Sequence, residues 1–174
     1  MSVQGRDEHR WRDGQWMPTI CGGCTAEKRV RGVSGRVYDL FITHAWRYHD
    51  DWTRMGELLD HLPGVSWRNF SVPWYDPAMD PNTELGGRFV RRWLEQQIVP
   101  VCGVILLSSV YSSKSARKWV ELEIELARKH QKPIVGVPAY GEEMMSPEAL
   151  SRVDAACPWD AQQILAVLDA QLAL

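Results

Sequence analysis

Apolar residues along the chain alternate between short continuous runs and stretches with helical spacing. Short runs rich in β-branched and aromatic residues predict β-strands over 36–43, 65–72, 101–109 and 132–138. Apolar residues that recur every three or four positions predict helices over 50–62, 87–100, 118–130 and 159–174. Strands that alternate with helices of this length favour a central parallel sheet with helices on both faces. We therefore expect a single-domain α/β fold of the flavodoxin-like type.

Polar and aromatic residues follow two of the predicted strands directly. The first strand ends in Thr43, and His44, Ala45 and Trp46 follow it. The apolar run over 101–109 ends in Ser108 and Ser109. Ligands of open parallel sheets collect at the carboxyl ends of the strands, so these positions are candidate binding residues. Packing is an equally good explanation for His44 and Trp46, and the two serines lack an evident His/Asp pair that would make them nucleophiles.

The predicted helix over 118–130 carries one charged residue on its apolar side. At about 100° per residue, Glu123 falls within a broad apolar arc, whereas Glu121 and Glu125 fall on the solvated side. The arc is formed by Trp119, Val120, Leu122, Ile124, Leu126 and Ala127. An inward carboxylate is either a functional group or one half of a structural ion pair. Its candidate ion-pair partners are Arg91, Arg92 and Arg117.

Two segments lack the regular patterns of strands and helices. Residues 1–35 show no clear periodicity, so we expect an N-terminal extension over 1–35 and a domain over 36–174. The stretch 73–87 contains three prolines and paired glycines, which predicts a long surface loop. Long loops in compact domains are often functional, and Trp74 in this loop is a further candidate for substrate contact.

Composition and charge exclude several classes of protein. With 45% hydrophobic residues, 24% charged residues and a net charge of −2, the chain has the composition of a soluble globular domain. This balance favours neither nucleic acid nor an anionic membrane as a partner. The chain has no apolar run as long as a membrane span and no secretory signal at its start, so we expect a cytoplasmic protein. A phosphate-binding P-loop motif is also absent from the sequence.

The cysteines predict neither a disulfide framework nor a complete metal site. Cys102 lies inside an apolar run and is expected to be part of the core. Cys21 and Cys24 form a single CxxC, for which His9 is the only nearby further ligand, and structural zinc needs four. We therefore expect no metal.

Several segments, in order, carry a family resemblance that covers roughly residues 36–172. They read YDLFITHAWRYHDD, WRNFSVPWYDP, VILLSS, KWVELEIELARKHQKPIVGV and PWDAQQIL. Together they resemble the TIR-like domains of the Thoeris antiphage ThsB type. The most specific element is Trp119 followed by Glu123, directly after a predicted buried strand, which is similar to the tryptophan-to-glutamate pattern of TIR NAD hydrolases and cyclases.

The resemblance implies an enzyme that cleaves NAD⁺ and releases nicotinamide, with Glu123 as the catalytic residue. NAD⁺ would be the substrate, and no separate cofactor is implied. Family members often form a cyclic ADP-ribose isomer that activates a partner effector in antiphage defence, and TIR domains self-associate. The residues expected to contact the substrate are Thr43, His44, Ala45, Trp46, Trp74, Ser108 and Trp119.

Two other functions stay open at the level of sequence. One is a non-catalytic TIR module that acts only in assembly or recognition, since a fold does not settle function. The other is a different N-glycosidase or nucleoside transferase on the same fold. An inward Glu123 favours an enzyme, because a scaffold has no evident need for a carboxylate inside an apolar arc.

Overall fold

The computed structural model describes residues 11–12, 15–16, 37–44, 50–71 and 82–173. The chain divides into two compact units, Met1–Val33 and Ser34–Leu174. In the first unit, the short strands β1 (Trp11–Arg12) and β2 (Gln15–Trp16) pair antiparallel. The predicted boundary between an extension over 1–35 and a domain over 36–174 stays a prediction, because residues 17–36 lie outside the described part of the chain.

The second unit is built on a five-stranded parallel sheet. Its strands are β3 (Val37–Ile42), β4 (Ser66–Asn69), β5 (Gly103–Leu107), β6 (Ile134–Val137) and β7 (Ala155–Ala156). Their spatial order is β4-β3-β5-β6-β7, and every neighbouring pair is parallel. This order confirms the predicted flavodoxin-like α/β fold. The strand order reverses between β3 and β5, the position where such sheets usually bind ligands.

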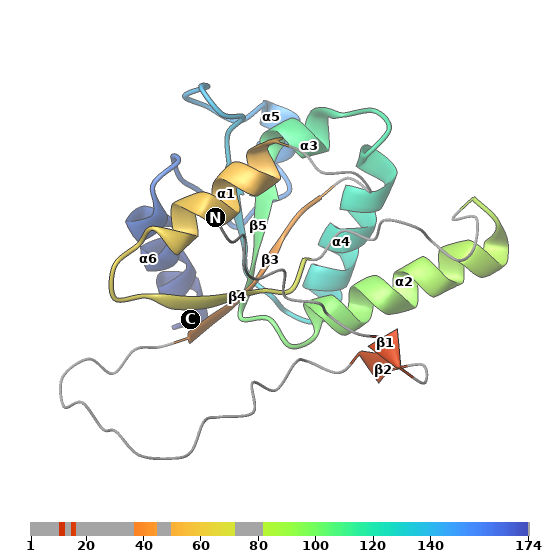
Figure 1. The fold of residues 1–174 in the computed structure, drawn as a ribbon. Coiled ribbons are helices and arrows are strands. Elements are labelled where there is room, and N and C mark those ends of the chain that lie inside the picture. The colour runs from red at the N-terminus through yellow and green to blue at the C-terminus, as the bar shows by residue number, and fades with distance from the viewer. Residues whose placement is uncertain (1–10, 13–14, 17–36, 45–49, 72–81, 174) are drawn as a thin grey trace, which may run out of the picture. The chain divides into compact units, whose positions relative to one another are not determined.

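Helices cover both faces of the sheet. They are α1 (Asp50–Asp60), α2 (Glu84–Ile98), α3 (Ser108–Ser112), α4 (Arg117–Lys129), α5 (Pro147–Leu150) and α6 (Ala161–Leu172). Figure 1 shows α1 and α6 on one side of the sheet and α2 and α4, which pack against each other, on the opposite side. The hydroxyl of Tyr38 on β3 donates to the Asp169 carboxylate on α6 over 2.8 Å and ties that helix to the sheet.

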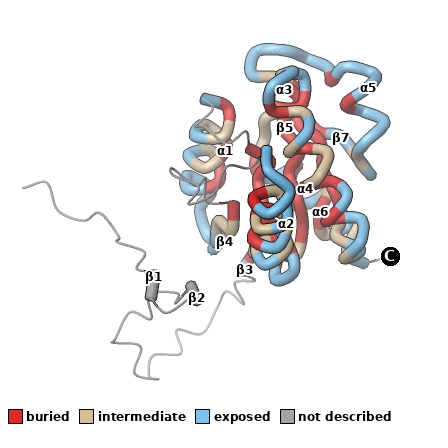
Figure 2. The backbone as a smooth tube through the Cα atoms, turned by 90° about the vertical axis from the view of Figure 1, so that its right-hand side faces the viewer, coloured by how far each residue is buried: buried red, intermediate tan, exposed pale blue. Residues whose placement is uncertain are grey.

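The core follows the apolar pattern of the sequence. All residues of β5 and β6 are buried, as expected for central strands covered by helices on both faces. Figure 2 shows the buried stretches in the strands and on the inner sides of the helices around them. Gly103 is needed where β5 meets α6, because a Cβ at this position would lie only 2.4 Å from Cδ2 of Leu168.

Several short elements differ from the sequence-based expectation. The predicted loop over 73–87 is wrong at its end, because α2 already begins at Glu84, and its glycines Gly86 and Gly87 lie inside the helix. Thr83 caps this helix by accepting a hydrogen bond from the Gly86 amide over 3.1 Å, and such a cap outweighs the weak helix propensity of glycine. The predicted strand over 101–109 gives way to α3 at Ser108.

Two elements at the far edge of the sheet were not predicted at all. The two-residue strand β7 and the four-residue helix α5 are too short to show a periodicity. Among the described residues, no helix is long and apolar enough to cross a membrane.

Candidate active site

Helix α4 places Glu123 in the interior of the unit. The helix buries Val120, Ile124, Leu126 and Ala127 against the sheet, and Glu123 lies on the same side with 1% of its surface exposed. Its neighbour Glu125 lies on the outer side and pairs with Arg91 of α2 over 2.5 Å. The inward direction predicted for Glu123 is therefore confirmed, and helical geometry alone explains it.

The partner of Glu123 comes from the end of β3. His44 follows this strand by two residues, and its Nδ1 atom lies 3.0 Å from Oε1 of Glu123. The His44 side chain is itself only 3% exposed. Two of the candidate arginine partners pair elsewhere, Arg91 with Glu125 and Arg117 with Glu148. A histidine takes their place because β3 and α4 meet at the carboxyl edge of the sheet.

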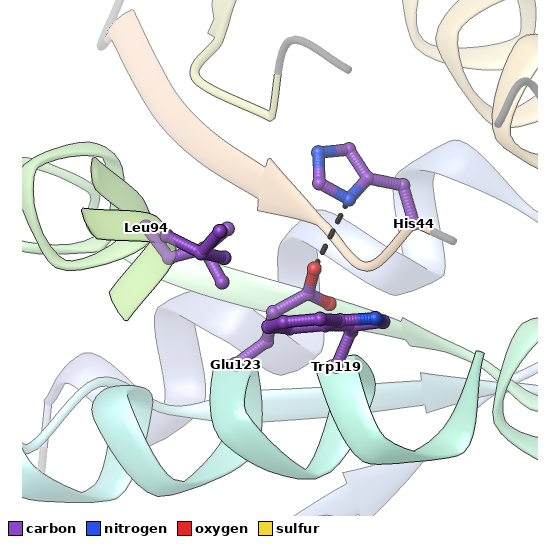
Figure 3. Close-up of a pocket in the computed structure, with 5 residues that line it drawn as sticks. His44, Leu94, Trp119 and Glu123 are labelled. Carbon is purple, nitrogen blue, oxygen red and sulfur yellow. Dashed lines mark ion pairs between the residues drawn. The ribbon is translucent and has the colours of Figure 1, made fainter. Parts of the chain in front are cut away.

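His44 and Glu123 line a pocket between α2, α4 and the end of β3. Its other walls are Val90 and Leu94 of α2 and the half-buried Trp119 of α4. Figure 3 shows the His44 ring and the Trp119 indole on opposite sides of the Glu123 carboxylate. About 200 Å³ of unfilled space, part of it open to solvent, lies in this pocket. A polar pair in an otherwise apolar pocket is the usual composition of a ligand site.

Burial dominates the electrostatics of Glu123. Removal from water raises the pKa of this carboxyl group above its ordinary value of 4.5. His44, through its charge and its hydrogen bonds, opposes this rise only in part. The second carboxylate oxygen, Oε2, is buried and makes no hydrogen bond to any described residue. A buried acceptor without a partner usually costs about 1–3 kcal/mol, so proteins retain one mainly where a ligand satisfies it.

This arrangement suits the stabilisation of positive charge on a bound molecule. A carboxylate in a low-dielectric pocket attracts a cationic centre far more strongly than it would in water. Its free oxygen can also accept a hydrogen bond from a substrate hydroxyl. The apolar and aromatic walls would exclude water and contact a planar ring.

The other residues predicted to contact substrate lie in different places. Trp119 and His44 line the pocket, whereas Thr43 and Ser108 are buried and are not among its lining residues. The Thr43 hydroxyl accepts a hydrogen bond from the Leu107 amide over 3.0 Å and so joins β3 to β5. Ala45, Trp46 and Trp74 lie outside the described residues. The substrate contacts of all these residues stay predictions.

The contribution of α2 to the pocket was not predicted from the sequence. Val90 and Leu94 are four residues apart on the buried side of this helix, a spacing that predicts one helical face. The sequence contains no signal that this face meets α4 at a pocket.

The described residues allow a search for a metal site in part of the chain. In the described segments, no three His, Cys, Asp or Glu side chains lie close enough together to hold a metal ion. Cys21, Cys24 and His9 lie outside these segments.

Comparison with known protein families identifies the chain. No curated protein sequence matches it significantly. The family model described as "Thoeris protein ThsB, TIR-like domain" matches residues 41–143, which is more than half of the chain. The matched range includes the end of β3 and all of α2 and α4, and therefore His44, Trp119 and Glu123. Because this match covers more than half of the sequence, the chain belongs to the TIR-like domain family of Thoeris protein ThsB.

Proposed function

We propose that this chain is an NAD⁺-cleaving enzyme in which Glu123 is the catalytic carboxylate. The single observation that carries the proposal is the buried Oε2 atom of Glu123, which lines the pocket and has no hydrogen-bond partner among the described residues. Cleavage of the bond between nicotinamide and ribose develops oxocarbenium character at the anomeric carbon. A carboxylate fixed beside that carbon stabilises the charge, and nicotinamide leaves as a neutral group without needing a strong acid.

The charge of the substrate supports this assignment. The nicotinamide ring of NAD⁺ is cationic, so its entry into the pocket favours the ionised form of Glu123, which burial alone disfavours. The Trp119 indole can stack on the planar nicotinamide ring, and a cation over an aromatic ring is attracted to it.

The product and the partners belong to the same proposal. We expect a cyclic ADP-ribose-type nucleotide that diffuses to a partner effector in antiphage defence, and self-association of the TIR-like domains. The alternatives are a non-catalytic assembly or recognition module and another N-glycosidase or nucleoside transferase. The unpartnered carboxylate oxygen favours an enzyme over an assembly module, because assembly through the surface leaves the cost of that oxygen unexplained.

Incubation of the purified full chain with NAD⁺ tests the proposal. Nicotinamide release and the mass of the second product are followed by chromatography and mass spectrometry. Glu123→Gln should lower turnover by at least about 100-fold, as expected when one preorganised electrostatic group is removed. Glu125→Gln is the matched control, because Glu125 lies on the outer side of the same helix and pairs with Arg91. Equal turnover in both variants would overturn the proposal. Release of a free base from nucleosides, with no release of nicotinamide from NAD⁺, would also overturn it.

A further inference from the structure

His44 is held rigidly by the two central strands. The backbone amide of the preceding Thr43 donates to the Ile105 carbonyl over 2.9 Å, and the Thr43 hydroxyl accepts from the Leu107 amide over 3.0 Å. The His44 ring also packs against Phe41, with an edge-to-face angle of 62° and 5.6 Å between ring centroids. The ring therefore has little freedom to turn away from the pocket.

The contact between His44 and Glu123 divides the two carboxylate oxygens into different roles. Oε1 lies 3.0 Å from Nδ1 of His44, an ion-pair contact without hydrogen-bond geometry, whereas Oε2 has no hydrogen-bond partner among the described residues. In Figure 3 the His44 ring points toward the carboxylate from the end of β3. One oxygen is thus occupied by the protein and the other is left for a ligand.

We propose that His44 is a positioning residue, whose Nδ1 pairs with Oε1 of Glu123 and so directs Oε2 toward a ribose hydroxyl of the substrate. This inference rests on the proposed NAD⁺-cleaving function and deepens it. Nδ1 of His44 must carry a proton in this pair, because an ionised carboxylate can only accept a hydrogen bond. It also gives His44 a role other than the substrate contact expected from the sequence.

Among the described residues, His44 is the group that opposes the effect of burial on Glu123. The α2 residues that face the carboxylate across the pocket, Val90 and Leu94, are apolar, and the adjacent strands β5 and β6 contain no titratable residue. The nearest charges of α2 and α4 pair with one another on the outer side, as Arg91–Glu125 and Glu95–Lys129. Within the described part of the chain, His44 is accordingly the neighbour that lowers the pKa of Glu123 against the effect of burial.

Loss of His44 has a defined effect on the titration of Glu123. Without its partner, the carboxyl group keeps the burial that raises its pKa and loses the contribution that lowers it. The pH midpoint of Glu123 should therefore rise. If the ionised form is the active one, the acid limb of turnover should move to higher pH by the same amount.

Carbon-13 NMR of glutamate-labelled protein measures this midpoint without any catalytic activity. The Glu123 signal is assigned by its loss in Glu123→Gln, and it is titrated in the wild type, His44→Ala and His44→Asn. We expect a higher midpoint in His44→Ala. Asparagine places an amide nitrogen near the position of Nδ1, so His44→Asn should retain the orientation of the carboxylate and remains informative if the alanine variant folds poorly.

Kinetics with NAD⁺ supplies the second measurement. His44→Ala should lower kcat by about 100-fold, since a misplacement of about 1 Å can cost this much, and His44→Asn should recover at least about 10-fold of that loss. His130→Asn is the matched control, because His130 contacts Glu95 over 2.7 Å on the outer side of the same helix pair. This control should leave both kcat and the Glu123 midpoint unchanged.

The two measurements separate the inference from the proposed function. An unchanged Glu123 midpoint in a folded His44→Ala protein overturns the positioning role, as does a rise in KM alone. A shifted midpoint in a chain whose wild type releases no nicotinamide supports the His44–Glu123 pairing and overturns NAD⁺ cleavage instead.

Discussion

Replacement of Glu123 by glutamine should stabilise the fold, although it removes the proposed catalytic group. The side chain is 1% exposed, and its Oε2 atom has no hydrogen-bond partner among the described residues. Glutamine keeps nearly the same shape and removes the charge, whose burial costs more than the roughly 1–3 kcal/mol of a neutral polar atom without a partner. We expect the free energy of unfolding near neutral pH to rise by about 1–2 kcal/mol, or about 2–8 °C in Tm for a chain of this size.

The gain should depend on pH with a definite sign. Burial raises the folded-state pKa of Glu123 above its ordinary value of 4.5, so the folded protein binds this proton more tightly than the unfolded chain does. Ionisation of Glu123 therefore lowers the free energy of unfolding of the wild type as the pH rises from 4.5 through the folded-state pKa. Glu123→Gln lacks this loss. The two proteins should be similar in stability at about pH 4 and diverge at higher pH.

Urea denaturation followed by tryptophan fluorescence at several pH values measures this difference. Glu125→Gln serves as the control, because its carboxylate is exposed and outside the pocket. A structural ion pair would behave in the opposite way, since breaking a buried pair typically destabilises by about 3–5 kcal/mol. A Glu123→Gln protein that is less stable than the wild type by that amount at neutral pH would refute the reasoning.

Two further substitutions test contacts of the central strands, one between β3 and β5 and one between β5 and α6. Thr43→Val leaves the Leu107 amide without its acceptor at 3.0 Å, so it should lower the free energy of unfolding by about 1–3 kcal/mol. Thr43→Ser keeps the hydroxyl and should retain most of the stability. Equal melting curves for Thr43→Val and the wild type would contradict this role. Gly103→Ala places a Cβ 2.4 Å from Cδ2 of Leu168 and should cost about 1–3 kcal/mol in urea denaturation. Gly56→Ala in α1 meets no atom within 4 Å and should instead stabilise by about 0.5–1 kcal/mol, and a loss in this control would point to an effect other than crowding.

Local patterns determined the main elements and the direction of Glu123. The run that forms β5 is apolar without interruption because a central strand is covered on both faces, so its sequence predicts its place in the sheet. The inward direction of Glu123 depends only on its angular position among Val120, Ile124 and the other apolar residues of α4. Neither inference needs a contact between distant parts of the chain.

Short elements and helix ends were beyond the reach of these patterns. Strand β7 has two residues and is held by its pairing with β6, which is a tertiary interaction. The start of α2 depends on the hydrogen bond from the Gly86 amide to Thr83, whereas the two glycines by themselves indicate a loop.

Only the tertiary structure decided which residue accompanies Glu123. His44 and Glu123 are far apart in sequence, and the candidate arginines Arg91 and Arg117 pair with Glu125 and Glu148 instead. Parallel pairing of β3 with β5 brings the end of β3 to the edge of the sheet where α4 begins. The crossover through α2 then adds Val90 and Leu94 as the opposite wall. Periodicity is a property of neighbouring residues, whereas a pocket is formed by strand order and helix packing, which the sequence pattern does not specify residue by residue.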